Sequence, residues 1–552
     1  MQEYKWWQDT VFYQIYPRSF CDSNGDGIGD IRGIVQKLDY IKWLGVGAVW
    51  LSPVYDSPNK DTGYDIRDYR RILREYGTME DFDLLLAEMH KRGLRLVMDV
   101  VVNHTSDEHP WFVASRSSRD DPHRAYYYWR PGKGDGPPNN WSSFFAPSAW
   151  KYDTITGEWY LHCFGENQPD LNWENPAVRE EIYDMINWWF DRGVDGIRID
   201  VVSLFAKNCR FPDATLRKPN YDGHVFPIEH IAFQPRLPEY LRELNARCLA
   251  GRDRVSIGEG TFATTENAGS IVGEDRLDLL FQFDLMELGN GEKKWDVHPY
   301  DIPAFRETVL AWQRALDWNA LFWCNHDQPR AVSRFDCPTP ALQARCAKML
   351  AGAMYCLRGT PFLYQGEELG MTNYPFSDEN ELRDIESIAF LHYEAAHDNA
   401  AYAWAGIRSK GRDNARTPMQ WSDRPNAGFT TGVPWIPVNP NYPRLNAEQQ
   451  ARDPGSVLAF YRALLGLRRR SEALLHGTFR PLEQPGAEVF AYERRFGNER
   501  VLVVANMGLR PQPLDCAQEL LDGEMLLHNL EQGPDQTLQP YELRIVRLSS
   551  SR

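Results

Sequence analysis

The residues best suited to catalysis in this 552-residue sequence stand at the ends of short apolar runs. Asp200 and Glu259 form a pair of carboxyls of the kind that cleaves glycosidic bonds. One attacks the anomeric carbon while the other, kept protonated, gives its proton to the leaving oxygen. The full set is Asn103 and His104 in "DVVVNH", Arg198 and Asp200 in "GIRID", Glu259 in "VSIGE", and His326 and Asp327 in "FWCNHD".

The sequence around each carboxyl predicts its charge state. Arg198 lies two residues before Asp200, so both side chains project to one face of an extended strand, and the guanidinium would keep Asp200 ionised. Glu259 lies in "SIGEGT" with no cation adjacent in sequence, a setting compatible with a raised pKa. The two carboxyls would then divide the work of nucleophile and acid.

Eight apolar runs, separated by helical patterns, must position these residues. Continuous apolar runs suit parallel strands buried on both faces, so the alternation predicts a (β/α)₈ barrel with its chemistry at the carboxyl ends of the strands. One intervening helix begins at the N-cap Thr78, with Asp81 three residues on. The runs span residues 11–16, 48–51, 94–101, 196–200, 255–259, 279–283, 320–325 and 361–365.

Two segments depart from this alternation. Residues 105–172 are aromatic and rich in Pro and Gly, and too long for a plain loop, so they predict a small domain inserted after the third strand. From residue 472 the pattern changes to strands joined by polar turns, which predicts a C-terminal antiparallel β-sandwich over 472–552. The catalytic barrel then comprises residues 1–104 and 173–471.

Composition excludes several classes of partner. The formal charge of −16 disfavours nucleic acid and anionic membranes, which are bound through a Lys and Arg surplus. Nine scattered cysteines without a C-x-x-C pair argue against a disulfide framework or a zinc cluster. No secretory signal pattern or long apolar run is evident, so we expect a soluble cytoplasmic protein without an organic cofactor. Oligomeric state is left open.

Four of these runs, in order, resemble the four signature regions of the α-amylase superfamily of glycoside hydrolases. They are "DVVVNH" (99–104), "GIRIDVV" (196–202), "IGE" (257–259) and "NHD" (325–327). The stretch "QPDLN" (168–172) is similar to the extra signature of the oligo-1,6-glucosidase subfamily, which also includes α-glucosidases. Further matches are "DTGYDIRDY", "NHDQPR", "YQGEELGMTN" and "RDNARTPMQW". The resemblance covers the chain from the first strand to the last domain.

The resemblance implies a retaining, exo-acting α-glucosidase acting on short oligosaccharides. Asp200 would be the nucleophile, Glu259 the general acid and then base, and Asp327 a third carboxylate that binds sugar hydroxyls. The two reacting carboxyls would lie about 5 to 5.5 Å apart. Arg198 would support Asp200, and two histidines would bind hydroxyls of the same sugar, namely His104 and His326.

The same resemblance implies a pocket closed at one end, from which single glucose units are released. Asp61 and Arg412 would grip the outermost hydroxyl of the non-reducing glucose, with Tyr64 stacked beneath the ring. Arg416 is the alternative to Arg412 in that pair. Phe164 and Gln168 would stand at the rim formed by the inserted domain, and for these aromatic and rim residues ordinary packing is nearly as good an explanation.

Val201, directly after the proposed nucleophile, bears on linkage. In the family a Val there accompanies preference for α-1,6 bonds, because its branched side chain narrows the space for the second sugar. The alternatives are an α-1,4-preferring or broad α-glucosidase, and a sucrose isomerase or transglucosylase. Sucrose isomerases carry an Arg-rich loop after "NHD", where this chain reads "RAVSRFDCPTP". Outside enzymes, an inactive glucosidase-like subunit or a sugar-binding module would not need the three carboxyls together.

The loop "CDSNGDGIGD" has oxygen donors at the spacing that hard cations require: Asp22, Asn24, Asp26, the carbonyl of Ile28, and Asp30. An EF-hand would need a Glu at position twelve, where this chain has Gly33. The resemblance implies a structural Ca²⁺ site remote from the chemistry, with Mg²⁺ as the other ion. A solvated acidic turn without metal is the alternative.

Overall fold

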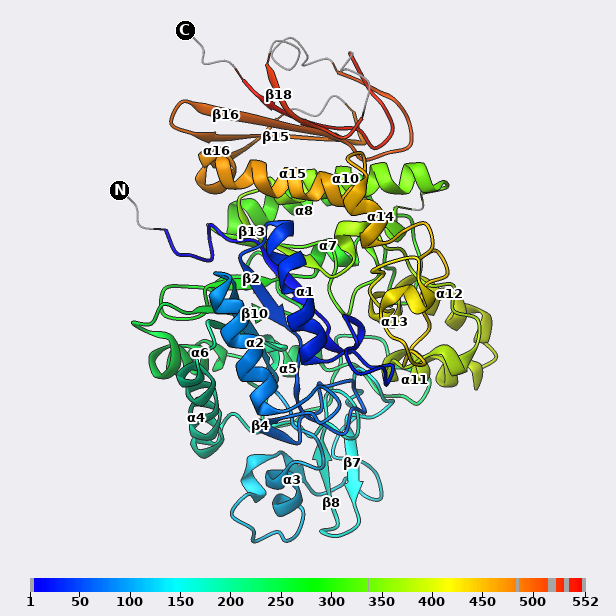
Figure 1. Cartoon of the computed structure of the whole chain (residues 1–552). Helices are drawn as coiled ribbons and strands as arrows, with labels where there is room; N and C mark the ends of the chain where they lie inside the picture. The colour runs from blue at the N-terminus through cyan, green and yellow to red at the C-terminus, as the bar shows by residue number, and fades with distance from the viewer. Residues whose placement is uncertain (1–3, 336, 483–485, 515–522, 531–535, 549–552) are drawn as a thin grey trace.

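A computed structural model describes residues 4–335, 337–482, 486–514, 523–530 and 536–548 (Figure 1). Its centre is a parallel barrel of eight strands in the order β11-β10-β9-β5-β2-β1-β13-β12, and the two end strands, β11 and β12, lie in contact. All eight predicted runs supply one strand each, so the predicted (β/α)₈ barrel is confirmed. The strands are β1 (Phe12–Ile15), β2 (Ala48–Leu51), β5 (Arg95–Val100), β9 (Gly196–Ile199), β10 (Val255–Glu259), β11 (Leu279–Phe281), β12 (Asn319–Leu321) and β13 (Gly359–Tyr364).

Amphipathic helices surround the strands. The Thr78 hydroxyl and the Asp81 carboxylate cap each other's backbone at the start of α2, as the sequence predicts. The longer helices are α1 (Ile31–Leu44), α2 (Met79–Lys91), α4 (Pro176–Arg192), α6 (Leu237–Leu244), α8 (Ile302–Ala315), α10 (Pro340–Tyr355) and α15 (Val457–Arg470). Shorter ones are α5 (Ile228–Ile231), α7 (Asp284–Glu287), α9 (Ala331–Arg334), α14 (Ala447–Arg452), η1 (Pro17–Ser19), η3 (Val202–Leu204), η4 (Asn245–Leu249), η5 (Ala268–Ser270), η6 (Glu367–Leu369), η7 (Glu379–Glu381) and η8 (Pro425–Gly428).

Residues 105–172 carry their own small sheet, drawn in blue and cyan at the lower end of Figure 1. Its elements are α3 (Pro110–Ser115), η2 (Arg124–Tyr126), β6 (Trp129–Arg130), β7 (Trp150–Asp153) and β8 (Glu158–Leu161). Trp141 bridges to Val225, so the packing of this segment extends to the loop after β9. The buried ion pair between Asp170 and Lys207, 2.8 Å, joins the same two segments. The predicted boundary at residues 172 and 173 remains a prediction.

Two further segments position functional side chains. A hairpin of β3 (Tyr55–Asp56) and β4 (Asp68–Ile72) follows the second barrel strand and carries Asp61 and Tyr64 between its strands. After β13, a group of helices with its own apolar core delivers Arg412 and Arg416. These helices are α11 (Ile385–Ala395), α12 (Ala400–Lys410) and α13 (Asp413–Arg416).

The C-terminal part is antiparallel and lies above α10, α15 and α16 in Figure 1. A five-stranded sheet and a two-stranded sheet share an apolar core, in which Leu514 and Leu538 meet Val504 and Val546. The predicted two-layered β domain is thus present, although parts of the predicted strand regions lie outside the described residues. The elements are α16 (Glu472–His476), β14 (Thr478–Pro481), β15 (Val489–Phe496), β16 (Glu499–Asn506), β17 (Gln512–Pro513), β18 (Glu524–His528), β19 (Thr537–Leu538) and β20 (Leu543–Arg547).

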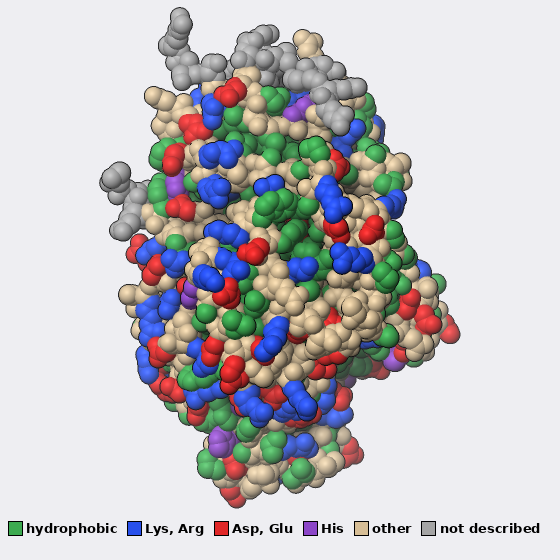
Figure 2. Space-filling view, in the orientation of Figure 1, with side chains coloured by type: hydrophobic (Ala, Val, Ile, Leu, Met, Phe, Trp, Pro, Cys, Tyr) green, Lys and Arg blue, Asp and Glu red, His purple; other side chains and the backbone are tan. Residues whose placement is uncertain are grey.

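Surface and composition agree with a globular protein. Lys, Arg, Asp and Glu side chains are interspersed over the face shown in Figure 2. Among the described residues, the eight cysteines form no disulfide with one another, and no helix has the length and apolarity needed to cross a membrane. The ninth cysteine, Cys516, lies outside the described residues.

Candidate active site

The carboxyl ends of three barrel strands bring the predicted carboxylates to one rim. Asp200 directly follows β9, Glu259 ends β10, and Asp327 lies in the loop after β12. β9 and β10 are neighbouring parallel strands in which Arg198 pairs with Ile257. The parallel register therefore delivers the nucleophile and acid candidates side by side.

Arg198 holds three carboxylates at the centre of this rim. Its Nη1 donates to Asp99 Oδ1 at 2.7 Å and to Asp200 Oδ1 at 2.8 Å, while Nη2 contacts Glu259 Oε2. The guanidinium is almost wholly buried and lies over the Trp50 ring. No cation is adjacent to Glu259 in sequence, but the register of β9 against β10 places Arg198 within reach of it.

Asp200 and Glu259 interact directly. Burial, together with the neighbouring Glu259 carboxylate, raises the pKa of Asp200 well above its usual range. The Arg198 guanidinium lowers the pKa of Asp200 but does not offset these two effects, so the prediction that Arg198 keeps Asp200 ionised is wrong for the protein without substrate. A retaining glycosidase needs its nucleophile ionised when the sugar is attacked.

Val201 connects the two carboxyls through the backbone. Its φ of 35° lies in the left-handed region, an unusual conformation for a β-branched residue and one that is found where the surroundings enforce it. The turn directs the Val201 N–H towards Glu259 Oε2, at 3.4 Å. The side chain is nearly buried in the apolar cluster that contains Phe164.

Asp327 is surrounded by cationic and polar groups. Arg416 Nη2 donates to its Oδ1 at 2.8 Å, and His326 Nε2 lies 2.9 Å from its Oδ2. Although burial alone raises it, His326, Arg412 and Arg416 lower the pKa of Asp327 well below its usual range. Asp327 is therefore ionised over the neutral range and cannot serve as a proton donor there.

The structure places Arg412, not Arg416, next to Asp61. Arg412 Nη2 donates to Asp61 Oδ1 at 2.8 Å, and its Nε donates to Asp384 Oδ1 at 2.8 Å. Arg416 turns to Asp327 instead. Gln168 Nε2 donates to the other Asp61 oxygen at 3.0 Å, so the inserted segment meets the β3–β4 hairpin at this point.

The remaining predicted side chains surround the same cluster. Tyr64 stacks on His326, with ring centroids 5.0 Å apart, and its hydroxyl donates to Asp99 Oδ2 at 2.9 Å. His104 lies 3.0 Å from the Tyr64 carbonyl, and Phe164 lies beside its ring at 5.0 Å. Burial lowers the pKa of His104, which keeps the imidazole neutral for hydroxyl contacts.

Two acidic members of the site were missed from sequence. Asp99 accepts from Arg198, Tyr64 and Trp50, and an acid inside the apolar run "LVMDVV" was an available signal. Asp384 is fully buried, caps α11 and pairs with Arg412, yet nothing around it in sequence marks it. Although burial acts in the opposite direction, Arg412 lowers the pKa of Asp384.

The predicted metal loop lies elsewhere. Its hydrogen bonds run to the segment after η8, where the Phe429 carbonyl accepts from the Asp22 N–H at 3.1 Å. The Asp22 carboxylate accepts from the Gly25 and Gly27 N–H groups, and Asp30 caps α1. Within the described residues, none of its three carboxylates has a Lys, Arg or His partner, and no three acidic, His or Cys side chains converge as metal ligands.

The barrel carries Asp200 and Glu259, bridged by Arg198, and a third carboxylate, Asp327, at one rim, an arrangement typical of glycoside hydrolases. The model of the α-amylase catalytic domain matches residues 14–477. The chain belongs to the α-amylase family. It is 46% identical over 560 residues to an oligo-1,6-glucosidase of Bacillus cereus, covering 99% of this chain and 100% of that protein.

Two other relatives have different names. A trehalose-6-phosphate hydrolase of Bacillus subtilis (strain 168) is 44% identical, with 99% of this chain and 98% of that protein covered. The crystal structure of an isomaltulose synthase from Klebsiella sp. LX3 superimposes with a TM-score of 0.94 at 42% identity, covering 99% of this chain and 100% of that one.

Proposed function

We propose that this protein is an exo-acting α-glucosidase that releases glucose from the non-reducing ends of short α-glucosides, with preference for α-1,6 bonds. The observation that carries the proposal is the Asp61–Arg412 ion pair, which is backed by Asp384 and Gln168 and stands beside the three carboxylates. We infer that this pair binds the hydroxyls of the terminal sugar and closes that end of the substrate site. The name of the Bacillus cereus relative, oligo-1,6-glucosidase, supports a preference for α-1,6 bonds.

The residues present divide the chemistry as follows. Ionised Asp200 attacks the anomeric carbon, and a covalent β-glucosyl ester forms as the glycosidic C–O bond breaks. Glu259 gives its proton to the departing oxygen and then takes one from the attacking water. Arg198 bridges both carboxyls and limits the charge repulsion between them, while Asp327 remains ionised beside Arg416 and His326.

Isomaltotriose tests this assignment directly. We expect glucose and isomaltose as the first products, with glucose released as the α anomer, observed by ¹H NMR before mutarotation. When isomaltotriose is labelled at its reducing end, cutting at the non-reducing end leaves the label in isomaltose, whereas cutting at the reducing end puts the label in glucose. Release of β-glucose, or cutting from the reducing end, would contradict the proposal.

Val201 supports the α-1,6 preference, because it directly follows Asp200 and its branched side chain packs in the apolar cluster that contains Phe164. Val201→Thr keeps the β-branch and replaces a methyl by a hydroxyl. We expect the ratio of kcat/KM for isomaltose over maltose to fall about tenfold, or about 1.4 kcal/mol. An unchanged ratio in a variant of normal melting temperature would show that Val201 does not set linkage.

Sucrose isomerisation is the second candidate, favoured by the similarity to the isomaltulose synthase. The arginines after "NHD" in this chain are not free to contact sugar. Arg330 is buried and donates to the Gln365 and Ala415 carbonyls, and Arg334 contacts Gln328 and the Pro329 carbonyl. We expect sucrose to give chiefly glucose and fructose, resolved by chromatography.

We also propose that the 22–30 loop binds a structural Ca²⁺, through Asp22, Asn24, Asp26, the Ile28 carbonyl and Asp30. The three carboxylates lack a cationic partner in the described residues, and successive Asx turns already shape the loop. Chelation by EDTA should lower the melting temperature by several degrees, with Ca²⁺ restoring it. Asp26→Asn, which removes one exposed carboxylate of the set, should reduce that response, while Asp253→Asn should leave it unchanged.

A cytoplasmic location completes the proposal. In the described part of the chain, eight cysteines form no disulfide with one another and seven of them are buried, which suits a reducing compartment.

A further inference from the structure

Two consecutive buried glutamates, Glu367 and Glu368, follow the last barrel strand in the turn η6. Neither forms an ion pair within the described residues, and neither has a role in the chemistry derived above. Each carboxylate instead accepts from two tyrosines. Glu367 accepts from Tyr355 and Tyr461, and Glu368 accepts from Tyr13 and Tyr40.

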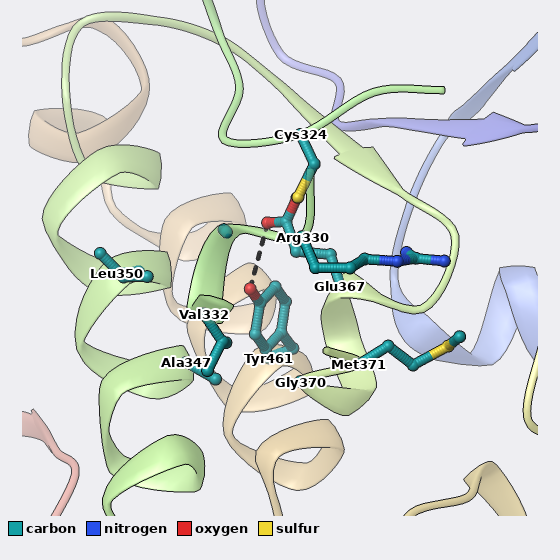
Figure 3. A pocket seen from close by; sticks show the side chains of 10 residues that line it. Cys324, Arg330, Val332, Ala347, Leu350, Glu367, Gly370, Met371 and Tyr461 are labelled. Atoms are coloured by element: carbon teal, nitrogen blue, oxygen red, sulfur yellow. Dashed lines mark hydrogen bonds between the residues drawn. The ribbon is translucent and has the colours of Figure 1, made fainter. Parts of the chain in front are cut away.

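Glu367 lines a small cavity between α9, α10, α15 and the turn η6 (Figure 3). The cavity holds about 10 Å³, room for one water at most, so an ionised carboxylate there could not regain a hydration shell. Tyr461 Oη donates to Glu367 Oε1 at 3.1 Å, and the Cys324 thiol donates to Oε2 at 3.5 Å. Figure 3 shows Cys324 pointing down onto the carboxyl and Arg330 extending beside it.

This cavity is connected to the catalytic rim by two short routes. Cys324 stands three residues before Asp327 in the same chain segment. Arg330, which lines the cavity, donates to the Gln365 carbonyl at 2.6 Å and to the Ala415 carbonyl at 3.0 Å. Ala415 directly precedes Arg416, the residue that holds Asp327. Contacts thus run from Glu367 through Cys324 to the loop that carries Asp327, and from Arg330 in the wall of the same cavity to the segment that carries Arg416.

We propose that Glu367 is a positioning residue for Asp327, which holds the end of β12 and the Arg416 segment in place while its carboxyl is neutral and loosens them when it ionises. The titratable and charged groups that face it are Tyr355, Tyr461, Cys324, Glu368, Arg330 and Arg334. Glu368 disfavours a second negative charge, the donors on Tyr355, Tyr461 and Cys324 favour the ionised carboxyl, and the two arginines are committed to backbone carbonyls and neighbouring side chains.

The expected pH range follows from burial. Burial raises the pKa of Glu367 to about 7, and the donors on Tyr355, Cys324 and Tyr461 act in the opposite direction. The native state thus binds more protons than the unfolded chain between the ordinary Glu pKa and about 7. This contribution to stability is fully present in acid and is lost as pH rises through that range.

Thermal unfolding tests the titration without any substrate. We expect the wild-type melting temperature to fall relative to that of Glu367→Gln between pH 5 and pH 8, by roughly 2 °C or more. Glu368→Gln removes the neighbouring carboxyl, whose pKa burial also raises and whose donors are Tyr13 and Tyr40, so it measures separately how much of the pH dependence belongs to Glu368. Parallel wild-type and Glu367→Gln curves over this range would overturn the proposal.

Activity tests the positioning role, using kcat/KM on 4-nitrophenyl α-glucoside, whose leaving group needs little protonation by Glu259. The wild-type value should fall about tenfold from pH 7 to pH 8.5, while Glu367→Gln should change less than about threefold. Tyr355→Phe removes a hydrogen-bond donor to the ionised Glu367 carboxylate, so the decline of kcat/KM should move to higher pH than in the wild type. This variant provides the test if Glu367→Gln does not fold. Glu368→Gln should keep the wild-type decline.

A folded Glu367→Gln with the wild-type pH profile, or a Tyr355→Phe profile that does not move, would overturn the proposal. The kinetic readout rests on the proposed α-glucosidase activity, whereas the thermal readout does not. Absence of turnover in every variant would therefore count against the substrate, and parallel melting curves would count against Glu367.

Discussion

Asp200→Asn is expected to lower kcat/KM on any α-glucoside at least about a thousandfold, equivalent to about 4 kcal/mol of transition-state stabilisation. Asn cannot form the ester to the anomeric carbon, and no other carboxylate takes its place. Glu259 is held by Arg198 and the Val201 N–H, and Asp327 is bound by Arg416. Initial rates on 4-nitrophenyl α-glucoside measure the effect.

The fold should survive this substitution. The raised pKa of Asp200 means that its ionisation costs stability in the native state, so removing the charge removes that cost. Arg198 keeps two partners in Asp99 and Glu259. We expect a melting temperature at pH 7 no lower than that of the wild type. The exposed Asp253→Asn serves as the matched control, and retained activity in Asp200→Asn would remove the nucleophile assignment.

Glu259→Gln is expected to have an effect that depends on the leaving group. Isomaltose needs a proton on its departing oxygen, so kcat/KM should fall about a thousandfold or more. An aryl glucoside with a good leaving group should lose much less in the first step. The glucosyl ester then accumulates, because no base activates water, and a burst of nitrophenol equal to the enzyme concentration should appear.

Azide provides the control for the second step. It attacks the ester without giving up a proton, so it should restore turnover of the aryl glucoside and yield α-glucosyl azide. Equal losses on both substrates, with no burst and no azide effect, would show that Glu259 is not the acid and base.

The barrel could be predicted because its strands are buried on both faces and so read as continuous apolar runs. The end of each run marks the rim of the barrel, so the sequence alone predicts that Asp200, Glu259 and Asp327 lie near one another. The capping box at Thr78 was equally local. These features depend on residues within one run or one helical turn.

The site contacts that the sequence did not predict join residues that are far apart in the chain. The contact between Arg198 and Glu259 follows from the pairing of β9 with β10, which no local pattern encodes. Asp384 meets Arg412 only because the helices after β13 fold back onto the rim. The sequence also left open whether Arg412 or Arg416 pairs with Asp61, because both lie in one short segment. Only the orientation of that segment against the rim places Arg412 next to Asp61 and Arg416 next to Asp327.

The measurement that tests the central claim most directly is kcat/KM on isomaltose and maltose side by side, with sucrose as a third substrate and the products resolved by chromatography. We predict faster cleavage of isomaltose, with glucose as the only product from either disaccharide and no isomaltulose or trehalulose from sucrose. Faster cleavage of maltose would contradict the linkage assignment built on Val201. Failure to turn over any of the three would contradict the α-glucosidase itself.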